Sequence, residues 1–416
     1  MIKNIVIFLI LLGSAFFFNV VFLPGRVIFL IQFAITGLML LTVIVQQIYG
    51  GIETDRHNFR QPLFLILTGV FLSMIIAQSF HSQSFALTFW AQRYMYFYVF
   101  YFFLHILKPD IKDLEKIILT LGFLYAASYI VQFLIFPTTI FDVRQGAERG
   151  TIRIFIPGSS FLRLALFYYL HRFYTQNRIR DVYPVVIFLS ILILQGTRYG
   201  LSATVLVILG SLIFSKTIRS RYLIFVIVLI SIAPLYFIFQ DIFAGLIEVS
   251  ERQSQNIESD IRIRAATFFL TDFFPNTLAY IFGNGQDHMG SIYGIRVNAY
   301  KIYHGFYQSD IGIIGDFSKY GLFFVVGTFW LIIKTLRTPL KSEYTYLKYY
   351  IFNAALVMPV SSVFANSFSI ALWCVMLYII DYNINTLTQE SADAESGLHD
   401  MPEHNDVPGE LEKAVI

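Results

Sequence analysis

Hydrophobic residues fall in long runs separated by short polar stretches along most of the chain. A helix that crosses a bilayer needs roughly 20 mostly apolar residues, because lipid offers no partner to backbone N–H and C=O groups. We therefore predict an all-α polytopic membrane protein, with about twelve transmembrane helices within residues 1–385. The predicted runs are 4–23, 27–48, 61–79, 93–107, 116–136, 157–173, 183–197, 199–214, 222–240, 309–333, 349–365 and 367–385.

The sequence does not define the ends of all these runs sharply. The fourth, seventh and eighth runs are short, and the pair around Gly196 to Gly200 is also compatible with one broken helix. Lys3 is followed by a run from Ile5 to Leu23 without an A-x-A-like cleavage site, so we expect a first spanning helix rather than a signal peptide.

The distribution of Lys and Arg predicts the orientation, since cytoplasmic loops carry an excess of both. Twelve crossings with both termini in the cytoplasm fit best. Two outside segments, 137–156 and 241–308, are exceptions, although a loop as long as the second translocates largely regardless of charge. The basic residues placed inside are Lys3, Arg56, Arg60, Lys108, Lys112, Lys116, Arg172, Arg178, Arg180, Lys216, Arg219, Arg221, Lys334, Arg337, Lys341 and Lys348.

Two segments lie outside the predicted membrane domain. Residues 241–308 form a long loop between helices 9 and 10, with a helix-like stretch from Ser259 to Phe274 and a turn at 283–285. Residues 386–416 are acidic and polar, and we predict a disordered cytoplasmic tail. No internal repeat with paired broken segments, of the kind found in many transporters, is present in the sequence.

Composition agrees with a membrane protein and narrows its partners. Hydrophobic residues make up 56% of the chain and charged residues only 14%, against about 25% charged residues in soluble domains. The net charge of +3 gives no support for a nucleic-acid partner. Cys374 is the only cysteine, so an intrachain disulfide is excluded.

Arginines on the predicted outer side are the first candidates for function, because the charge rule disfavours them there. Arg144, Arg149, Arg153, Arg198, Arg262 and Arg264 would form a cationic site for an anionic lipid headgroup. The alternative for each one singly is a solvated loop charge or an anchor to ordinary phospholipid.

Arg198 is the strongest of these candidates. Apolar helix flanks it on both sides, so its charge lies at or within the membrane edge, where an ionisable residue is costly and suggests function. A structural ion pair or a helix cap is the alternative. Arg163, about six residues inside its predicted helix, is a similar but weaker case.

A histidine near the end of the long loop is a candidate general base. A neutral imidazole can accept the proton of a sugar hydroxyl as that hydroxyl attacks. His304 and His288 compete for this role on equal local grounds, and either is alternatively a plain polar residue. The sequence contains no HExxH, CxxC or P-loop motif and no D-x-D on the outer side, so we predict neither a metal site nor a cofactor.

Four features resemble the O-antigen polymerase and O-antigen ligase superfamily of polytopic glycosyltransferases. The chain has many predicted membrane helices and a long loop before the third-last one. Residues 194–201 (LQGTRYGL) are similar to a small-residue, Ser/Thr-Arg-Gly-type junction. Within the loop, 260–266 (DIRIRAA) and 282–285 (FGNG) are similar to an Arg followed by a G-x-G pattern. The fourth feature is His304, followed by 310–315 (DIGIIG) and 320–321 (YG).

The resemblance implies a GT-C-like fold and a reaction at the periplasmic face of the bacterial inner membrane. The implied substrate is undecaprenyl-pyrophosphate-linked oligosaccharide, with arginines holding the pyrophosphate and a His serving as base. Catalytic roles then go to His304, Arg264 and Arg198, and substrate binding to Arg262, Arg153, Arg149, Arg144, Asp310 and His288. Two arginines, Arg262 and Arg264, stand where the family usually has one, and Gly305 follows the His where an amide residue is common.

The leading hypothesis is a metal-independent polymerase of O-antigen-type or capsule-type repeat units, with membrane lipids and a chain-length regulator as further partners. The closest alternative is a ligase that transfers the glycan to lipid A core. A flippase or other transporter is the alternative from a different class, and a non-catalytic membrane scaffold is a third. Polar groups gathered at one face, rather than at the bilayer midplane, favour a transferase over a transporter.

Overall fold

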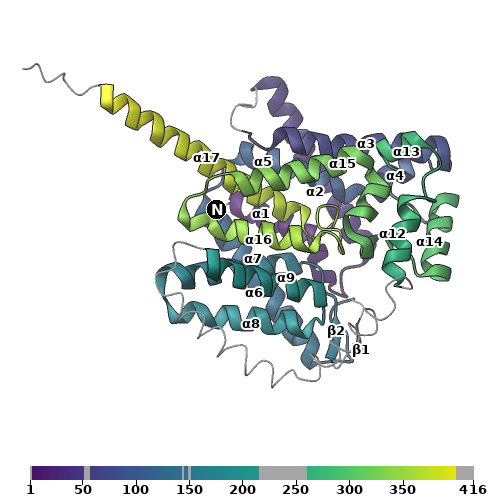
Figure 1. Ribbon diagram of the computed structural model, residues 1–416, viewed down its shortest axis with the longest axis horizontal. Helices are drawn as coiled ribbons and strands as arrows, with labels where there is room; N and C mark the ends of the chain where they lie inside the picture. Colours follow the sequence, from purple (N-terminus) through teal and green to yellow (C-terminus); the bar gives the residue numbers. More distant parts are fainter. Residues whose placement is uncertain (1, 51–56, 143–144, 149–150, 215–259, 400–416) are drawn as a thin grey trace, which may run out of the picture.

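The computed structural model describes residues 2–50, 57–142, 145–148, 151–214 and 260–399. The described chain is predominantly helical, and its two strands, β1 (Gln145–Glu148) and β2 (Thr151–Ile154), form a small antiparallel hairpin in which Gln145 pairs with Ile154 (Figure 1). The α-helices are α1 (Ile2–Ser14), α2 (Gly25–Tyr49), α3 (Arg60–His81), α4 (Phe85–Ala91), α5 (Val99–Leu107), α6 (Ile111–Leu134), α7 (Ser159–Gln176), α8 (Val182–Leu194), α9 (Arg198–Phe214), α12 (Ile261–Leu270), α13 (Thr277–Phe282), α14 (Ile292–His304), α15 (Gly312–Arg337), α16 (Thr345–Val357) and α17 (Ile370–His399). The 3-10 helices are η1 (Phe16–Asn19), η3 (Arg93–Tyr98), η4 (Ile179–Asp181), η6 (Gln308–Ile311) and η7 (Ser342–Tyr344).

Small residues allow the closest helix pairs to form. A Cβ on Gly69 of α3 would lie 2.8 Å from the backbone N of Phe324 in α15, and a Cβ on Gly327 would lie 3.0 Å from the carbonyl oxygen of Pro62. Gly122 of α6 meets α7 in the same way, since its Cβ would lie 2.8 Å from the Cβ of Ala165. In lipid the hydrophobic effect does not drive helices together, so van der Waals attraction must hold them. That attraction requires backbones to approach as closely as they do here.

Five helices among the described residues are long and apolar enough to cross a membrane, and the predicted number of about twelve is not reproduced. They are 25–49, 60–81, 111–134, 308–337 and 370–391. The mainly helical character and the apolar helices agree with the predicted class of helical membrane protein.

Several predicted runs fold as shorter or interrupted helices, which explains the lower count. The run at 4–23 ends as a helix at Ser14 and continues through positive-φ residues from Phe16 to Asn19. The run at 93–107 is divided between η3 and the nine residues of α5, and the run at 349–365 leaves the helix after Val357. Apolar composition thus identifies buried or lipid-facing segments without requiring each to be one straight helix. The run at 222–240 lies outside the described residues.

The last helix is longer than expected. α17 continues to His399, so residues 386–399, which we predicted to be a disordered tail, are helical. Residues 400–416 lie outside the described residues. In Figure 1 this helix leaves the bundle on the side opposite to α12 and α14.

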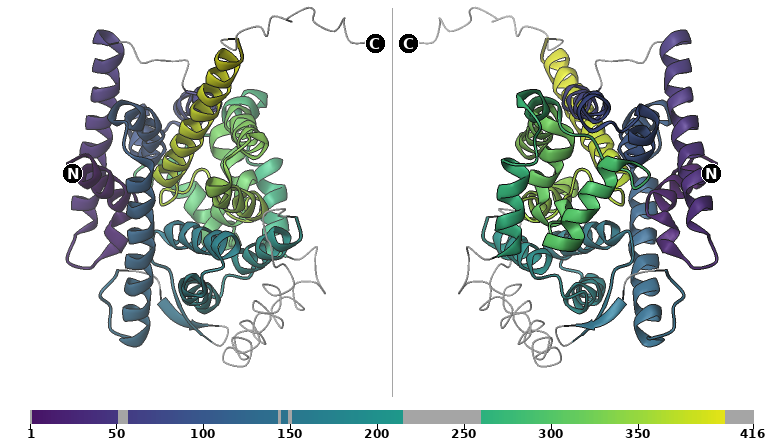
Figure 2. Two further views of the ribbon diagram at one scale, coloured as in Figure 1. Left: turned by 90° about the vertical axis from the view of Figure 1, so that its left-hand side faces the viewer. Right: turned by 90° about the vertical axis from the view of Figure 1, so that its right-hand side faces the viewer.

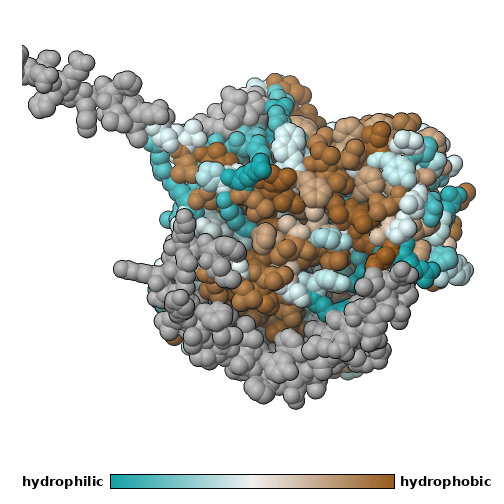
Figure 3. Space-filling view, viewed as in Figure 1, coloured by the Kyte–Doolittle hydropathy of each residue, from teal (hydrophilic) through white to brown (hydrophobic). Residues whose placement is uncertain are grey.

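Hydrophobic and hydrophilic surface residues are separated along the direction of the long helices. The long helices run roughly horizontally in Figure 1, and the same view in Figure 3 shows hydrophobic residues over the middle of this face, with hydrophilic residues gathered toward its left and right edges. α12, α13 and α14 cluster at one edge, beyond the hydrophobic middle. This distribution is that expected of a bundle embedded in lipid with one polar cap.

Candidate functional site

The candidate site is built around the junction between α8 and α9. Two separate helices meet there, and Gly196 adopts a φ of +61° between them. Gln195 donates from Nε2 to the hydroxyl of Tyr125 on α6 at 2.8 Å, which holds the junction against the bundle. Arg198 is the first residue of α9 and is half-buried. The turn therefore fixes the predicted Arg198 at a helix start rather than inside a continuous span.

Three further arginines converge on this junction from different elements. Arg153 of β2 directs its Nε toward the carbonyl oxygen of Gln195 at 3.5 Å. Nη2 of Arg163 on α7 lies 3.1 Å from the position that a Cβ on Gly200 would take. The Cζ of Arg262 on α12 lies 5.3 Å from the ring centre of Tyr199. Residues 153, 163 and 262 thus all reach the segment 195–200 that also carries Arg198. We call Arg153, Arg163, Arg198 and Arg262 the junction arginines.

Two of the junction arginines have spare hydrogen-bond donors. Nε of Arg163 and Nη1 of Arg262 are buried and have no hydrogen-bond partner among the described residues. Neither arginine forms an ion pair within the part of the chain that the structure describes. Buried polar groups are normally satisfied, and a buried unpaired cation is costly. Positive charge concentrated in this way is suited to an anion with several oxygen atoms.

α12 separates the two arginines that the sequence left as alternatives. The side chain of Asp260 caps this helix by accepting a hydrogen bond from the backbone N of Arg262 at 2.8 Å. Residues two apart point in directions about 200° apart on a helix. Arg262 accordingly faces Tyr199, whereas Arg264 is exposed and has its Cζ 5.9 Å from the ring centre of Phe306. Of the pair, Arg262 belongs to the junction.

His304 lies near Arg264, beside the face of α12 that is turned away from Tyr199. It is the last residue of α14, is exposed, and has its ring centre 5.5 Å from that of Phe306. Gly305 follows it with a φ of +68°, and a Cβ there would lie 2.4 Å from Cδ1 of Ile261. Glycine adopts this left-handed conformation without strain and leaves Ile261 in place, which suits position 305 as the C-cap of α14. Phe306 is the common contact of Arg264 and His304.

His288 does not share this location. It precedes α14 and His304 ends it, so the length of the helix, about 18 Å, separates them. Nδ1 of His288 accepts a hydrogen bond from the backbone N of Gly290 at 3.0 Å. Its own backbone N donates to Oε1 of Gln83 at 2.9 Å, which ties this turn to the end of α3. His288 therefore has a local role in the turn.

Of the remaining predicted site residues, the structure describes Asp310 but not Arg144 or Arg149. Asp310 in η6 is exposed, and its Oδ1 accepts from Oγ of Ser309 at 3.1 Å. Arg144 and Arg149 lie outside the described residues, next to the ends of β1. The structure accordingly gives no placement for two of the six predicted outer arginines.

Sequence reasoning missed a polar network beneath the cap. The buried side chain of Gln83 accepts from the backbone N of His288 and from Oγ of Ser291, and donates to the carbonyl oxygen of Gln286 at 2.7 Å. Asp287 pairs with Lys301 at 3.2 Å. A glutamine in a short loop carries no signal of this kind, because its partners come from residues about 200 positions away.

Asp316 is a second residue that sequence reasoning missed, and here a signal was present. It is buried in α15, and Oγ of Ser362 donates to both of its carboxylate oxygens, at 2.8 and 2.9 Å. A carboxylate inside an apolar run is itself a sign of a specific role.

The described residues contain no group of three or more His, Cys, Asp or Glu side chains placed to hold a metal ion. Comparison of the chain with protein-family models and with curated proteins finds no match. The fold and the junction arginines are therefore the basis for any assignment of function.

Proposed function

We propose that this protein is a polysaccharide repeat-unit polymerase that transfers a growing glycan from undecaprenyl pyrophosphate to the next lipid-linked unit. The observation that carries the proposal is the convergence of Arg153, Arg163 and Arg262 on the segment of Arg198. A pyrophosphate presents several oxygens and more than one negative charge, and guanidinium groups bind such oxygens through paired N–H donors. The unsatisfied donors of Arg163 and Arg262 are suited to this ligand.

The location of the junction arginines suits a lipid-linked substrate. They come from β2, the first half of α7, the start of α9 and the start of α12. These elements meet between the apolar bundle and the polar cap of α12 to α14 (Figure 1). A polyprenyl chain would remain in lipid while its pyrophosphate and sugars lie at the boundary. We assign this boundary to the periplasmic face of a bacterial inner membrane, with both termini in the cytoplasm and a chain-length regulator as a further partner.

The reaction breaks one bond and forms one. The bond between the anomeric carbon of the donor glycan and the pyrophosphate oxygen breaks, and its electron pair leaves with the lipid pyrophosphate. The junction arginines stabilise the negative charge that develops on that oxygen. A hydroxyl of the acceptor sugar forms the new bond to the anomeric carbon. Its proton passes through water to a ring nitrogen of His304, which lies on the other side of α12 from Arg262. Arg264, on the same face of α12, would position the acceptor.

Glycan ladders from a producing strain test the proposal. Replacing Arg262 or Arg198 with Ala should collapse the ladder to single repeat units, with the variant protein present in the membrane at the wild-type level. Arg178, one of the predicted cytoplasmic arginines, provides a matched control, and Arg178→Ala should leave the ladder unchanged. A normal ladder from the Arg262 and Arg198 variants would contradict the proposal.

The same strain separates polymerase from ligase. Loss of a polymerase leaves single repeat units attached to the final acceptor, whereas loss of a ligase leaves full-length glycan on the polyprenyl carrier. The second pattern would move the assignment to ligase while keeping the substrate and the junction arginines.

A further inference from the structure

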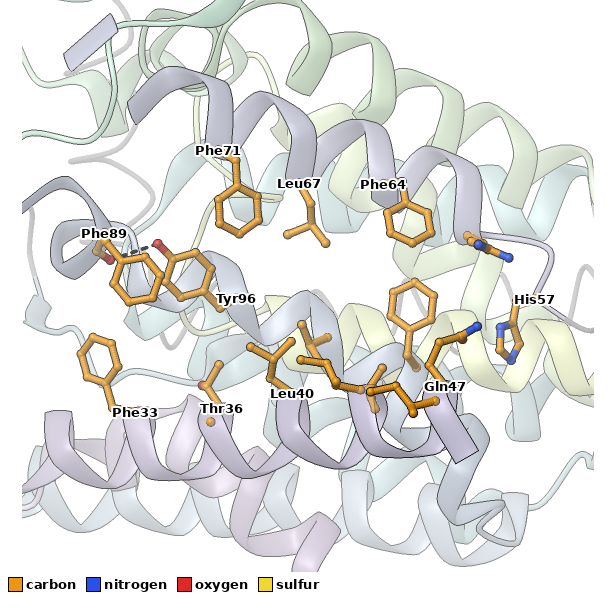
Figure 4. Close-up of a pocket in the computed structure, with 17 residues that line it drawn as sticks. Phe33, Thr36, Leu40, Gln47, His57, Phe64, Leu67, Phe71, Phe89 and Tyr96 are labelled. Atoms are coloured by element: carbon orange, nitrogen blue, oxygen red, sulfur yellow. Dashed lines mark hydrogen bonds between the residues drawn. The ribbon is translucent and has the colours of Figure 1, made fainter. Parts of the chain in front are cut away.

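A long apolar groove runs between α2 and the wall formed by α3, η3 and α5. α2 packs against α5 and stands apart from α3, at the edge of the bundle in both views of Figure 2. Figure 4 shows the groove, with Phe33, Thr36 and Leu40 of α2 facing Phe64, Leu67 and Phe71 of α3. Its volume is about 600 Å³.

The two ends of the groove differ in chemistry. At one end, aromatic rings close it: Phe33 stacks on Trp90 at 4.4 Å, and Phe89 stacks on Tyr96 at 4.6 Å. Gln47 and His57 lie at the opposite end in Figure 4, where α3 begins with Arg60.

Arg60 is the charged group at the polar end. Its Cζ lies 5.2 Å from the ring centre of Phe64, and it makes no ion pair with the described residues. Burial, together with the charges of His105 and Arg60, lowers the pKa of His57 to about 4, so that ring is neutral near pH 7. The lining therefore carries a single positive charge at one end and hydrocarbon along the rest.

The dimensions of the groove select its occupant. Phe33 and Ile48 are 15 residues apart on α2, which corresponds to about 22 Å of helix. A helix with side chains is 10–12 Å across, so over this length it would occupy about 2000 Å³. This exceeds the empty space of the groove, which is about 1540 Å³ with the part open to solvent included. An extended hydrocarbon chain is much thinner and matches both the length and the apolar walls.

We infer that the groove between α2 and α3 binds one chain of an anionic phospholipid, with the phosphate of its headgroup at Arg60. The aromatic end stops the chain, and Gln47 adds a neutral hydrogen-bonding group near the headgroup. The bound lipid fills the space that α2 and α3 leave between them. This inference does not depend on the proposed transferase reaction.

Gly37 provides a direct test, because it lines the groove and, within the part of the chain that the structure describes, no atom lies within 4 Å of the position that its Cβ would take. Gly37→Trp should fill the groove without disturbing the backbone, and Gly37→Leu is a milder version. Gly210 of α9 is the matched control, since it is also helical and no atom of the described residues lies within 4 Å of a Cβ there. It does not line the groove.

The experiment uses the purified full chain, delipidated in detergent and titrated with phosphatidylglycerol or phosphatidylcholine, with bound lipid counted by native mass spectrometry. Wild type and Gly210→Trp should bind one phosphatidylglycerol about fivefold more tightly than phosphatidylcholine, as one arginine near a headgroup predicts. Gly37→Trp should lose this molecule, Gly37→Leu should weaken its binding, and Arg60→Gln should bind both lipids equally.

Three results would overturn the inference. The first is equal binding of phosphatidylglycerol by the Gly37→Trp and Gly210→Trp variants, and the second is equal affinity of the wild type for both lipids. The third is displacement of phosphatidylglycerol from the wild type by an equimolar amount of undecaprenyl phosphate, because the groove would then belong to a polyprenyl chain. Melting temperatures of the variants, measured alongside, separate loss of binding from loss of folding.

Discussion

Gly321 anchors the polar cap to the membrane bundle, and replacing it with Ala should destabilise the protein. It interrupts α15 with φ +73° and ψ −169°, a conformation essentially restricted to glycine. A Cβ at this position would lie 2.4 Å from both the backbone N of Gly283 and the carbonyl oxygen of Ile281. Because both contacts are backbone atoms, the substituted chain must separate from the turn at 283–285.

The hydrogen bonds across this contact set the size of the effect. The break in α15 frees the carbonyl oxygens of Ser318 and Lys319, which accept from the backbone N atoms of Asn284 and Gly285 at 3.1 and 2.8 Å. Losing these two bonds at about 1 kcal/mol each, with about 2 kcal/mol of backbone strain, gives about 4 kcal/mol. For a chain of 416 residues the per-residue unfolding entropy converts this to a fall of about 5 °C in melting temperature.

Thermal unfolding of the purified protein in detergent measures this effect. Gly210→Ala is the control: its Cβ meets no atom of residues 2–50, 57–142, 145–148, 151–214 and 260–399 within 4 Å. Greater helix propensity should therefore leave the melting temperature unchanged or slightly raised. Identical melting curves for Gly321→Ala and wild type would refute the placement of the turn against the break in α15.

Three other predictions concern the cap and the junction. Arg262→Lys keeps the charge but loses the forked donors, and it should reduce polymer synthesis by about tenfold to 100-fold. Because Arg264 is exposed, Arg264→Lys should reduce synthesis less. Equal losses, measured as polymer per protein, would contradict the assignment of the two faces of α12. His304→Ala should abolish polymer synthesis while His288→Ala lowers mainly the melting temperature, and the reverse pattern would exchange their roles. Gln83→Ala removes three hydrogen bonds to the cap and should increase proteolysis of the cap in detergent, which limited digestion measures.

Much of the helical architecture was predictable from apolar runs, because lipid and core exclude polar residues alike. The number of spans was not, since an apolar run does not specify where its helix ends. Phe16 to Asn19 interrupt the first run with a positive-φ turn made of three phenylalanines and an asparagine. No propensity rule places such a turn among aromatic residues, and tertiary packing decides it.

The candidate site was predictable as a set of arginines but not as a geometry. Arginines on the predicted outer side are disfavoured by the excess of Lys and Arg in cytoplasmic loops. This pointed to Arg153, Arg198 and Arg262, which the structure brings to one junction. The sequence could not distinguish Arg262 from Arg264, because the face of α12 that meets Tyr199 depends on how the helix docks. Arg163 was underrated, since its approach to Gly200 joins segments that are separate in the sequence.

Synthesis of a new glycosidic bond by the purified protein tests the central claim most directly. The full chain in detergent, without any membrane gradient, is incubated with a fluorescent undecaprenyl-pyrophosphate-linked oligosaccharide, and product length is resolved by mass spectrometry. We predict lipid-linked products longer by whole repeat units with the wild type, and at least about tenfold less with Arg262→Lys. Substrate recovered unchanged from the wild type, under conditions where it binds the protein, would contradict the account and favour a transporter.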